Sequence, residues 1–175
     1  LTLTATRNIT QKANELIDKH LTAVVEQKFQ AERKELDIVH LNIKLKRESD
    51  REGASFKTDT EASIKCNASE VLSEGEQKAL AIAAFLTETH IVSPNGPIIL
   101  DDPVSSLDRK RSVKVAKRLA EEAKNRQVIV FTHDLIFYNE ICSEAQKLNI
   151  EPACTSIFSN ANGSGFVDPA GEPWR

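Results

Sequence analysis

Hydrophobic and polar positions repeat with two different periods along this chain, and each period predicts a type of element. Over residues 8–34, apolar side chains recur at the spacing of an amphipathic helix, with charged residues between them. Within residues 37–47 the odd-numbered positions 39–45 are apolar and the even-numbered positions 40–46 are polar, which predicts a half-buried strand. A more polar run at residues 55–65 is expected to pair with it as an antiparallel hairpin.

Helical and strand-like segments alternate after residue 70. The expected elements are helices at 73–90, 109–125 and 135–148 and strands at 98–100, 128–131 and 153–158. Short, continuous apolar strands are typical of a parallel sheet that is covered on both faces. The chain is therefore expected to be α/β, with a largely parallel sheet flanked by helices. The turn-rich end, from Ser159 to Arg175, predicts a last hairpin around Asn162-Gly163.

Composition narrows the class of protein. The 175 residues fit one domain, and 40% hydrophobic with 28% charged residues exclude a disordered chain. A net charge of −3 argues against a strongly basic nucleic-acid module. No apolar run is long enough for a membrane span and no signal peptide is visible, so a cytoplasmic protein without a membrane partner is expected. The odd number of cysteines, without CxxC spacing, argues against a disulfide framework.

Residues 72–77 read Leu-Ser-Glu-Gly-Glu-Gln and contain a capping box, because Ser73 is followed three residues later by Glu76. A capping box predicts a helix amino-terminus, whose free N–H groups and positive dipole end suit a phosphate. Gly75 lacks a side chain where a ligand could approach closely. An ordinary capped helix explains the same residues without any ligand.

Polar residues follow the two expected buried strands. Asp101 and Asp102 come after the first strand, and Thr132, His133 and Asp134 come after the second. In parallel α/β sheets ligands bind beyond the carboxyl ends of the strands. Paired acids suit Mg²⁺ and an activated water, and a histidine there could contact a phosphate. Each motif also has a simpler explanation, since Asp-Asp-Pro can end a strand and Thr-His-Asp can cap the next helix.

The order of these motifs resembles the carboxyl-terminal half of an ABC-type ATPase head. Leu-Ser-x-Gly-Glu-Gln opens a helix, Ile-Ile-Leu-Asp-Asp-Pro follows about 20 residues later, and Val-Ile-Val-Phe-Thr-His comes last. The resemblance spans residues 36–158 and is to the SMC, RecF and double-strand-break-repair branch of this P-loop NTPase class. The strings Asp-Asp-Pro-Val-Ser-Ser-Leu-Asp and Phe-Thr-His-Asp are similar to bacterial coiled-coil ATPases of the RloC and PrrC kind, which are linked to phage defence and tRNA cleavage.

The resemblance implies a role for each motif. The nucleotide-binding signature motif would consist of Leu72, Ser73, Gly75, Glu76 and Gln77, of which Ser73 and Gly75 would touch the γ-phosphate held by a partner head. The D-loop, which crosses the dimer interface, would consist of Ser105, Ser106, Leu107 and Asp108. Asp101 would be the Walker B acid that holds Mg²⁺ through water. Asp102 would orient the attacking water, and His133 would lie near the γ-phosphate.

Two departures from the family pattern affect the expected activity. The catalytic position, most often Glu, is Asp102, whose carboxylate is one methylene shorter, so hydrolysis is expected to be slow. None of the six glycines is followed by Lys, so a phosphate-binding loop G-x-x-x-x-G-K-[ST] cannot be written. An amino-terminal Walker A lobe of the same parent chain is therefore an expected partner. This chain alone is expected neither to bind Mg²⁺-ATP tightly nor to hydrolyse it.

The resemblance also predicts an organisation. Residues 1–34 are interpreted as a helix that either ends a coiled-coil arm or packs on the domain, and residues 35–175 as the carboxyl-terminal lobe of the head. A start at Leu1, with no methionine in the chain, favours a piece of a larger protein.

For the parent we expect an ATPase that binds and hydrolyses Mg²⁺-ATP and acts by head dimerisation, as a homodimer, in DNA repair or phage defence. Two alternatives remain. The head could be a slow or inert ATP sensor that gates an effector such as a nuclease, or a degenerate structural subunit. Nucleic acid would be contacted through the parent, because the basic stretch at 109–118 and Lys44, Lys46 and Arg47 also fit solvated faces.

Overall fold

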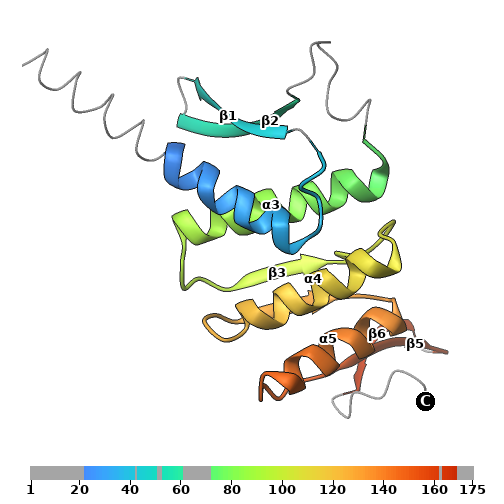
Figure 1. Cartoon of the computed structure of the whole chain (residues 1–175). Coiled ribbons are helices and arrows are strands. Elements are labelled where there is room, and N and C mark those ends of the chain that lie inside the picture. The colour runs from blue at the N-terminus through green and yellow to red at the C-terminus, as the bar shows by residue number, and fades with distance from the viewer. Residues whose placement is uncertain (1–21, 42, 51–52, 61–71, 162, 169–175) are drawn as a thin grey trace, which may run out of the picture. The chain divides into compact units, whose positions relative to one another are not determined.

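The computed structural model describes residues 22–41, 43–50, 53–60, 72–161 and 163–168 (Figure 1). The chain forms two compact units, residues 1–96 with 105–111 and residues 97–104 with 112–175. No helix in the described ranges has a stretch both long and apolar enough to cross a bilayer.

The first unit begins with a helix over residues 22–35, whose apolar side buries Val25 and Phe29. The part of the predicted helix 8–34 that precedes residue 22 lies outside the described residues. The helix ends in a turn over residues 36–41, which we call the arm turn. Asp37 has a φ of 59°, in the left-handed region, and helps to reverse the chain there.

The first predicted strand begins later than expected. β1 (Ile43–Asp50) pairs with β2 (Gly53–Thr60) as an antiparallel hairpin, which confirms the hairpin, but residues 37–41 belong to the arm turn. The reason is the buried Arg33, whose guanidinium donates hydrogen bonds to the four carbonyl oxygens of Ile38, Val39, Leu41 and Ile43. The Leu41 N–H also donates to the Ile38 carbonyl oxygen at 3.2 Å, so this segment forms a turn before the chain enters β1 at Ile43. Residues 61–65 of the second predicted strand lie outside the described residues.

α3 (Glu74–Val92) is the long helix of the first unit and agrees with the predicted helix 73–90. Ser73 caps its amino-terminus, and its apolar side chains face the core. The buried ones are Ala79, Leu80, Ile82, Ala83 and Leu86. His90 Nδ1 lies 3.7 Å from Glu32 Oε1, which connects the last turn of α3 to the helix over residues 22–35.

The second unit contains the parallel pair that the apolar runs predict. β3 (Ile98–Asp101) and β4 (Val128–Phe131) pair in parallel, with Asp101 opposite Phe131. The crossover between them passes through α4 (Arg109–Glu122), and α5 (Leu135–Lys147) follows β4. The α/β fold with a parallel pair and an antiparallel hairpin is thus confirmed.

A second hairpin follows α5. β5 (Ser156–Asn160) pairs antiparallel with β6 (Gly163–Asp168), which confirms the hairpin predicted around Asn162-Gly163. The run predicted at 153–158 starts at Ser156 and pairs with β6. Gly163, the first residue of β6, has a positive φ of 133° that glycine adopts readily, which suits the tight return of the chain onto β5. Cys142 and Cys154 are free thiols whose Sγ atoms lie 3.7 Å apart, and Cys66 lies outside the described residues.

Candidate functional site

The predicted signature motif forms the capped start of α3, and the capping box is confirmed. The Ser73 N–H donates to Glu76 Oε2 at 3.0 Å, and the Glu76 N–H donates to Ser73 Oγ at 3.3 Å. Gln77 Nε2 donates to the Leu72 carbonyl oxygen at 2.9 Å, so the residue before the cap is also tied to the first turn. Ser73 itself is exposed, which leaves the positive end of α3 accessible to an anion.

The predicted D-loop packs directly on this helix start. Ser106 Oγ donates to Glu74 Oε1 at 2.6 Å, and Lys78 Nζ donates to Ser105 Oγ. A Cβ atom added to the buried Gly75 would lie 2.6 Å from the Ser106 carbonyl oxygen. Glycine is therefore required at position 75 by the close approach of the chain's own backbone. The two motifs, about 30 residues apart in sequence, share one surface of the first unit.

Replacing Gly75 tests this contact. We expect Gly75→Ala to lower the free energy of unfolding by about 1–3 kcal/mol, because the new Cβ overlaps a backbone oxygen that cannot rotate away. Gly96→Ala is the matched control, since its Cβ would meet the Ser93 hydroxyl, a side chain that can turn. Denaturant unfolding of both variants gives the comparison, and an equal cost for the two would contradict the close packing.

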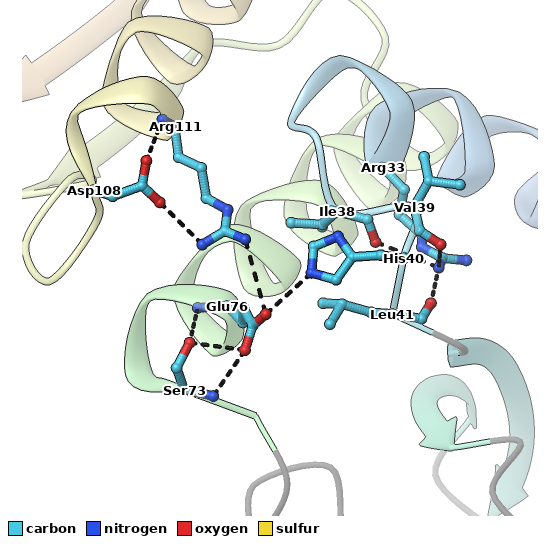
Figure 2. A network of polar contacts seen from close by, with 9 residues as sticks. All are labelled: Arg33, Ile38, Val39, His40, Leu41, Ser73, Glu76, Asp108 and Arg111. Atoms are coloured by element: carbon cyan, nitrogen blue, oxygen red, sulfur yellow. Dashed lines mark hydrogen bonds and ion pairs between the residues drawn. The ribbon is translucent and has the colours of Figure 1, made fainter.

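Glu76 is the electrostatic centre of this surface (Figure 2). Its pKa falls from the ordinary 4.5 to about 2, mainly because His40 donates a hydrogen bond, with further hydrogen bonds from Ser73 and the positive charge of Arg111. His40 and Arg111 are site residues that the sequence did not reveal. His40 lies 36 residues before Glu76 in the sequence. Arg111 belongs to the basic stretch at 109–118, for which the sequence suggested a nucleic-acid contact or a solvated face.

In the second unit, Asp102 and His133 meet beyond the carboxyl ends of β3 and β4. Asp102 Oδ2 lies 2.8 Å from His133 Nδ1, and Thr132 Oγ1 donates to Asp102 Oδ1 at 3.3 Å. The Asp102 N–H donates to the Phe131 carbonyl oxygen at 2.9 Å, so the link between the strands continues past β3. Asp102 adopts a φ of 47°, a left-handed conformation that Asp and Asn tolerate better than other side chains.

The helix cap considered for the Thr-His-Asp motif is present. Asp134 caps α5 by accepting from the backbone N–H groups of Ile136 and Phe137 at 2.8 and 3.2 Å. Thr132 and His133, in contrast, face Asp102, and the His133 side chain is 84% exposed. The cap therefore fixes the start of α5 while leaving the histidine accessible.

Asp101 and Asp102 could supply some, but not all, of the ligands of a Mg²⁺ ion. Asp101 ends β3 and is exposed, and carboxylate oxygens are the ligands that Mg²⁺ prefers. Within the described residues no three His, Cys, Asp or Glu side chains converge as a metal-holding set. This donor set fits an ion that is bound through one or two carboxylates and completed by water and phosphate oxygens, which is how Mg²⁺ usually binds.

The basic stretch of α4 is largely compensated. Lys110 Nζ lies 2.5 Å from Asp37 Oδ2, Arg111 Nη1 lies 3.0 Å from Asp108 Oδ2, and the other pairs lie within α4. Those pairs are Lys117 with Glu121 and Arg118 with Glu122. These four cations are thus neutralised by neighbouring acids, which favours a structural face over a nucleic-acid surface.

Solved structures that this chain resembles include head domains of SMC proteins. The chain superimposes on an SMC ATPase structure with a TM-score of 0.59 at 16% identity, covering 87% of this chain and 86% of that one. It also matches the Smc head domain of Pyrococcus yayanosii, with a TM-score of 0.65 at 17% identity, covering 95% of this chain and 30% of that one. The match to the Smc head domain of Pyrococcus furiosus has a TM-score of 0.64 at 18% identity and covers 95% of this chain and 39% of that one. At these identities the likeness establishes the fold, that of an SMC-type head.

Sequence relatives and a family model agree with that fold. A Treponema denticola protein that bears the name of an ABC transporter ATP-binding protein is 37% identical over 75 residues, covering 41% of this chain and 14% of that protein. The hemin import ATP-binding protein HmuV of Vibrio parahaemolyticus is 37% identical over 67 residues, covering 37% and 25%. The AAA_13 family model, described as an AAA domain, matches residues 4–162, so the chain belongs to this family. The predicted resemblance to an SMC-like, ABC-type ATPase head is confirmed.

Proposed function

We propose that this chain is the carboxyl-terminal lobe of an ATPase head in which ATP, bound with Mg²⁺, joins two heads of a homodimer. The observation that carries the proposal is the joint surface of residues 72–77 and 105–108. Ser73 is exposed on the positive end of a well-capped helix, and Ser106 approaches Gly75 closely beside it. An exposed helix start with a rigid neighbour suits the terminal phosphate of a nucleotide that a partner head holds.

Asp101, Asp102 and His133 complete the proposed chemistry. Asp101 would hold Mg²⁺ through water, and the ion would supply positive charge to the phosphates. Asp102 would orient the attacking water and accept its proton, and its own carboxylate is oriented by Thr132 and His133. The exposed His133 could then also donate a hydrogen bond to the γ-phosphate. Catalysis of this kind rests on positioning, to which the two contacts on Asp102 contribute.

The amino-terminal lobe that supplies the phosphate-binding loop would complete the sheet of the second unit. Among the described residues, β3 and β4 pair only with each other. Ile99 and Phe131 are 61% and 48% exposed, although strands of parallel sheets are normally covered on both faces. Further strands from another lobe would cover this surface, which supports the view that residues 35–175 are one lobe of a larger head.

The biological setting is proposed from resemblance. The likeness of residues 101–108 and 131–134 to RloC and PrrC ATPases supports a role in phage defence or DNA repair. An SMC ATPase with the same fold is associated with ATP-driven dimerisation and DNA-stimulated activation, which supports head closure here and nucleic acid as a partner of the parent. The helix over residues 22–35 would then continue a coiled-coil arm that ends at the head.

A second candidate function is a slow ATP sensor that gates an effector such as a nuclease. The engagement of both Asp102 oxygens favours it, since Oδ2 contacts His133 and Oδ1 accepts from Thr132. The Asp102 carboxylate, with both oxygens engaged by the protein, would bind the attacking water less well than the longer, unengaged carboxylate of a Glu at this position. Turnover in the full-length protein distinguishes the two candidates, because the sensor dimerises with ATP but barely hydrolyses it.

Replacing Ser73 by Asp or Asn tests head closure. Asp and Asn cap helices about as well as Ser, so Ser73→Asn should unfold within about 1 kcal/mol of the wild type. Ser73→Asp should cost somewhat more, because Ser73 Oγ lies 2.8 Å from Glu76 Oε2 and the new carboxylate would face that acid. We expect Ser73→Asp to lose Mg²⁺-ATP-dependent dimerisation of the full-length protein, because its charge repels the γ-phosphate, whereas the neutral Ser73→Asn dimerises measurably. Light scattering with and without Mg²⁺-ATP measures this. Equal dimerisation by the two variants would contradict a phosphate contact at Ser73.

A further inference from the structure

Glu76 makes four polar contacts with three segments of the first unit (Figure 2). Its Oε2 accepts from the backbone N–H of Ser73 at 3.0 Å and from Ser73 Oγ at 2.8 Å. Its Oε1 lies 3.1 Å from His40 Nε2 and 3.8 Å from Arg111 Nη2. Since a carboxylate only accepts, the His40 ring donates through Nε2. Both oxygens are therefore engaged with the protein.

His40 comes from the arm turn, which is rigidly held. Arg33 is 4% exposed, and its guanidinium binds the carbonyl oxygens on either side of His40, those of Val39 and Leu41. A ring whose flanking backbone is fixed in this way has little freedom to follow Glu76 if Glu76 moves. The arm turn also contacts the start of α4, where Lys110 Nζ lies 2.5 Å from Asp37 Oδ2.

Arg111 connects Glu76 to the predicted D-loop. Its Nη1 donates to Asp108 Oδ2 at 3.0 Å, and its backbone N–H donates to Asp108 Oδ1 at 3.0 Å. The guanidinium therefore lies between the acid of the 105–108 segment and the acid of the signature helix. Its side chain is 20% exposed, so water screens these contacts less than it would a fully exposed pair.

We infer that Glu76 is a positioning residue and not a nucleotide ligand, and that His40 and Arg111 hold it so that the arm turn, the signature helix and the D-loop form one rigid surface. The inference rests on the proposed function and changes one part of it, since Glu76 was predicted among the nucleotide-binding residues. To face a nucleotide, the carboxylate would have to leave Ser73, His40 and Arg111. The low pKa of Glu76, about 2, agrees with a carboxylate that these donors hold in its charged form.

A double-mutant cycle on the full-length protein tests the role. The variants are His40→Ala, Glu76→Gln and the double variant, and the readout is the Mg²⁺-ATP concentration at half-maximal dimerisation. Because a hydrogen bond to a charged group is lost, we expect each single variant to raise this concentration about threefold to tenfold. We expect the double variant to need the same Mg²⁺-ATP concentration as the more impaired single variant, because both changes remove the contact between His40 and Glu76. His90→Ala, at the other end of α3, is the matched control and should leave the concentration unchanged.

A second measurement needs no nucleotide. In this chain, the pKa of the Glu76 carboxylate can be followed by carbon-detected NMR, and we expect it to rise from about 2 toward 4.5 in His40→Ala. An unchanged pKa would overturn the His40 contact. A raised pKa together with additive effects in the cycle would make Glu76 a nucleotide ligand and overturn the positioning role. A wild-type protein that never dimerises with Mg²⁺-ATP, with the pKa still raised in His40→Ala, would overturn the proposed function and with it this role in closure, while the contact itself stands.

Discussion

We expect Asp102→Asn to lower ATP turnover of the full-length protein by about 100-fold or more, the usual contribution of a general base. The amide can neither accept a proton from water nor orient it as a carboxylate does. The backbone of residue 102 should be undisturbed, because Asn tolerates the left-handed φ of 47° as well as Asp does. Dimerisation with Mg²⁺-ATP should persist, since the change removes only the hydrolytic step. Phosphate release under saturating Mg²⁺-ATP measures the effect.

Asp134→Asn is the control for this experiment. It makes the same acid-to-amide change two residues beyond Thr132, where Asn caps α5 as well as Asp does, so turnover should match the wild type. If Asp102→Asn and the wild type hydrolyse ATP equally, Asp102 is not the catalytic carboxylate. A low, equal rate in both proteins, with dimerisation intact, would favour the slow sensor over the ATPase.

The elements that could be predicted from the sequence are those that local patterns determine. β4 lies at the predicted residues 128–131, because a short apolar run ends there in polar residues. The start of α3 follows from its capping box, in which both partners lie within one turn. The strand predicted at 37–47 begins late because residues 36–41 form a turn, closed by the hydrogen bond from Leu41 N–H to the Ile38 carbonyl and held by the guanidinium of Arg33 on the Val39 and Leu41 carbonyls. A side chain that binds distant backbone leaves no periodic signal.

The candidate site was predictable only in part for a similar reason. The motif order pointed to Ser73, Asp102 and His133, and the structure brings Asp102 and His133 together. The contact of Gly75 with the Ser106 carbonyl depends on how the 105–108 segment folds back on α3, which no local pattern encodes. His40 likewise reaches Glu76 across 36 residues. Long-range contacts of this kind need the fold before they can be recognised.

Glu122→Ala should cost about 3–5 kcal/mol of unfolding free energy, because it leaves two buried arginines without their shared acid. Glu122 Oε1 lies 2.5 Å from Arg118 Nη2, and its Oε2 lies 2.9 Å from Arg126 Nε. All three residues are less than 10% exposed, so water replaces the lost carboxylate poorly. Denaturant unfolding at constant m-value measures the loss.

Glu121→Ala, one residue earlier, is the matched control for the buried cluster. Glu121 pairs with Lys117 at 3.7 Å on an exposed face, so its removal should cost at most about 1 kcal/mol. Equal costs for the two variants would contradict the burial of the cluster.

Glu122 ends α4, and Arg126 lies two residues before β4, so the cluster fixes the end of the crossover that leads to Thr132 and His133. Glu122→Ala should therefore also broaden the NMR signals of the His133 ring, because the strand that carries this ring toward Asp102 loses its anchor.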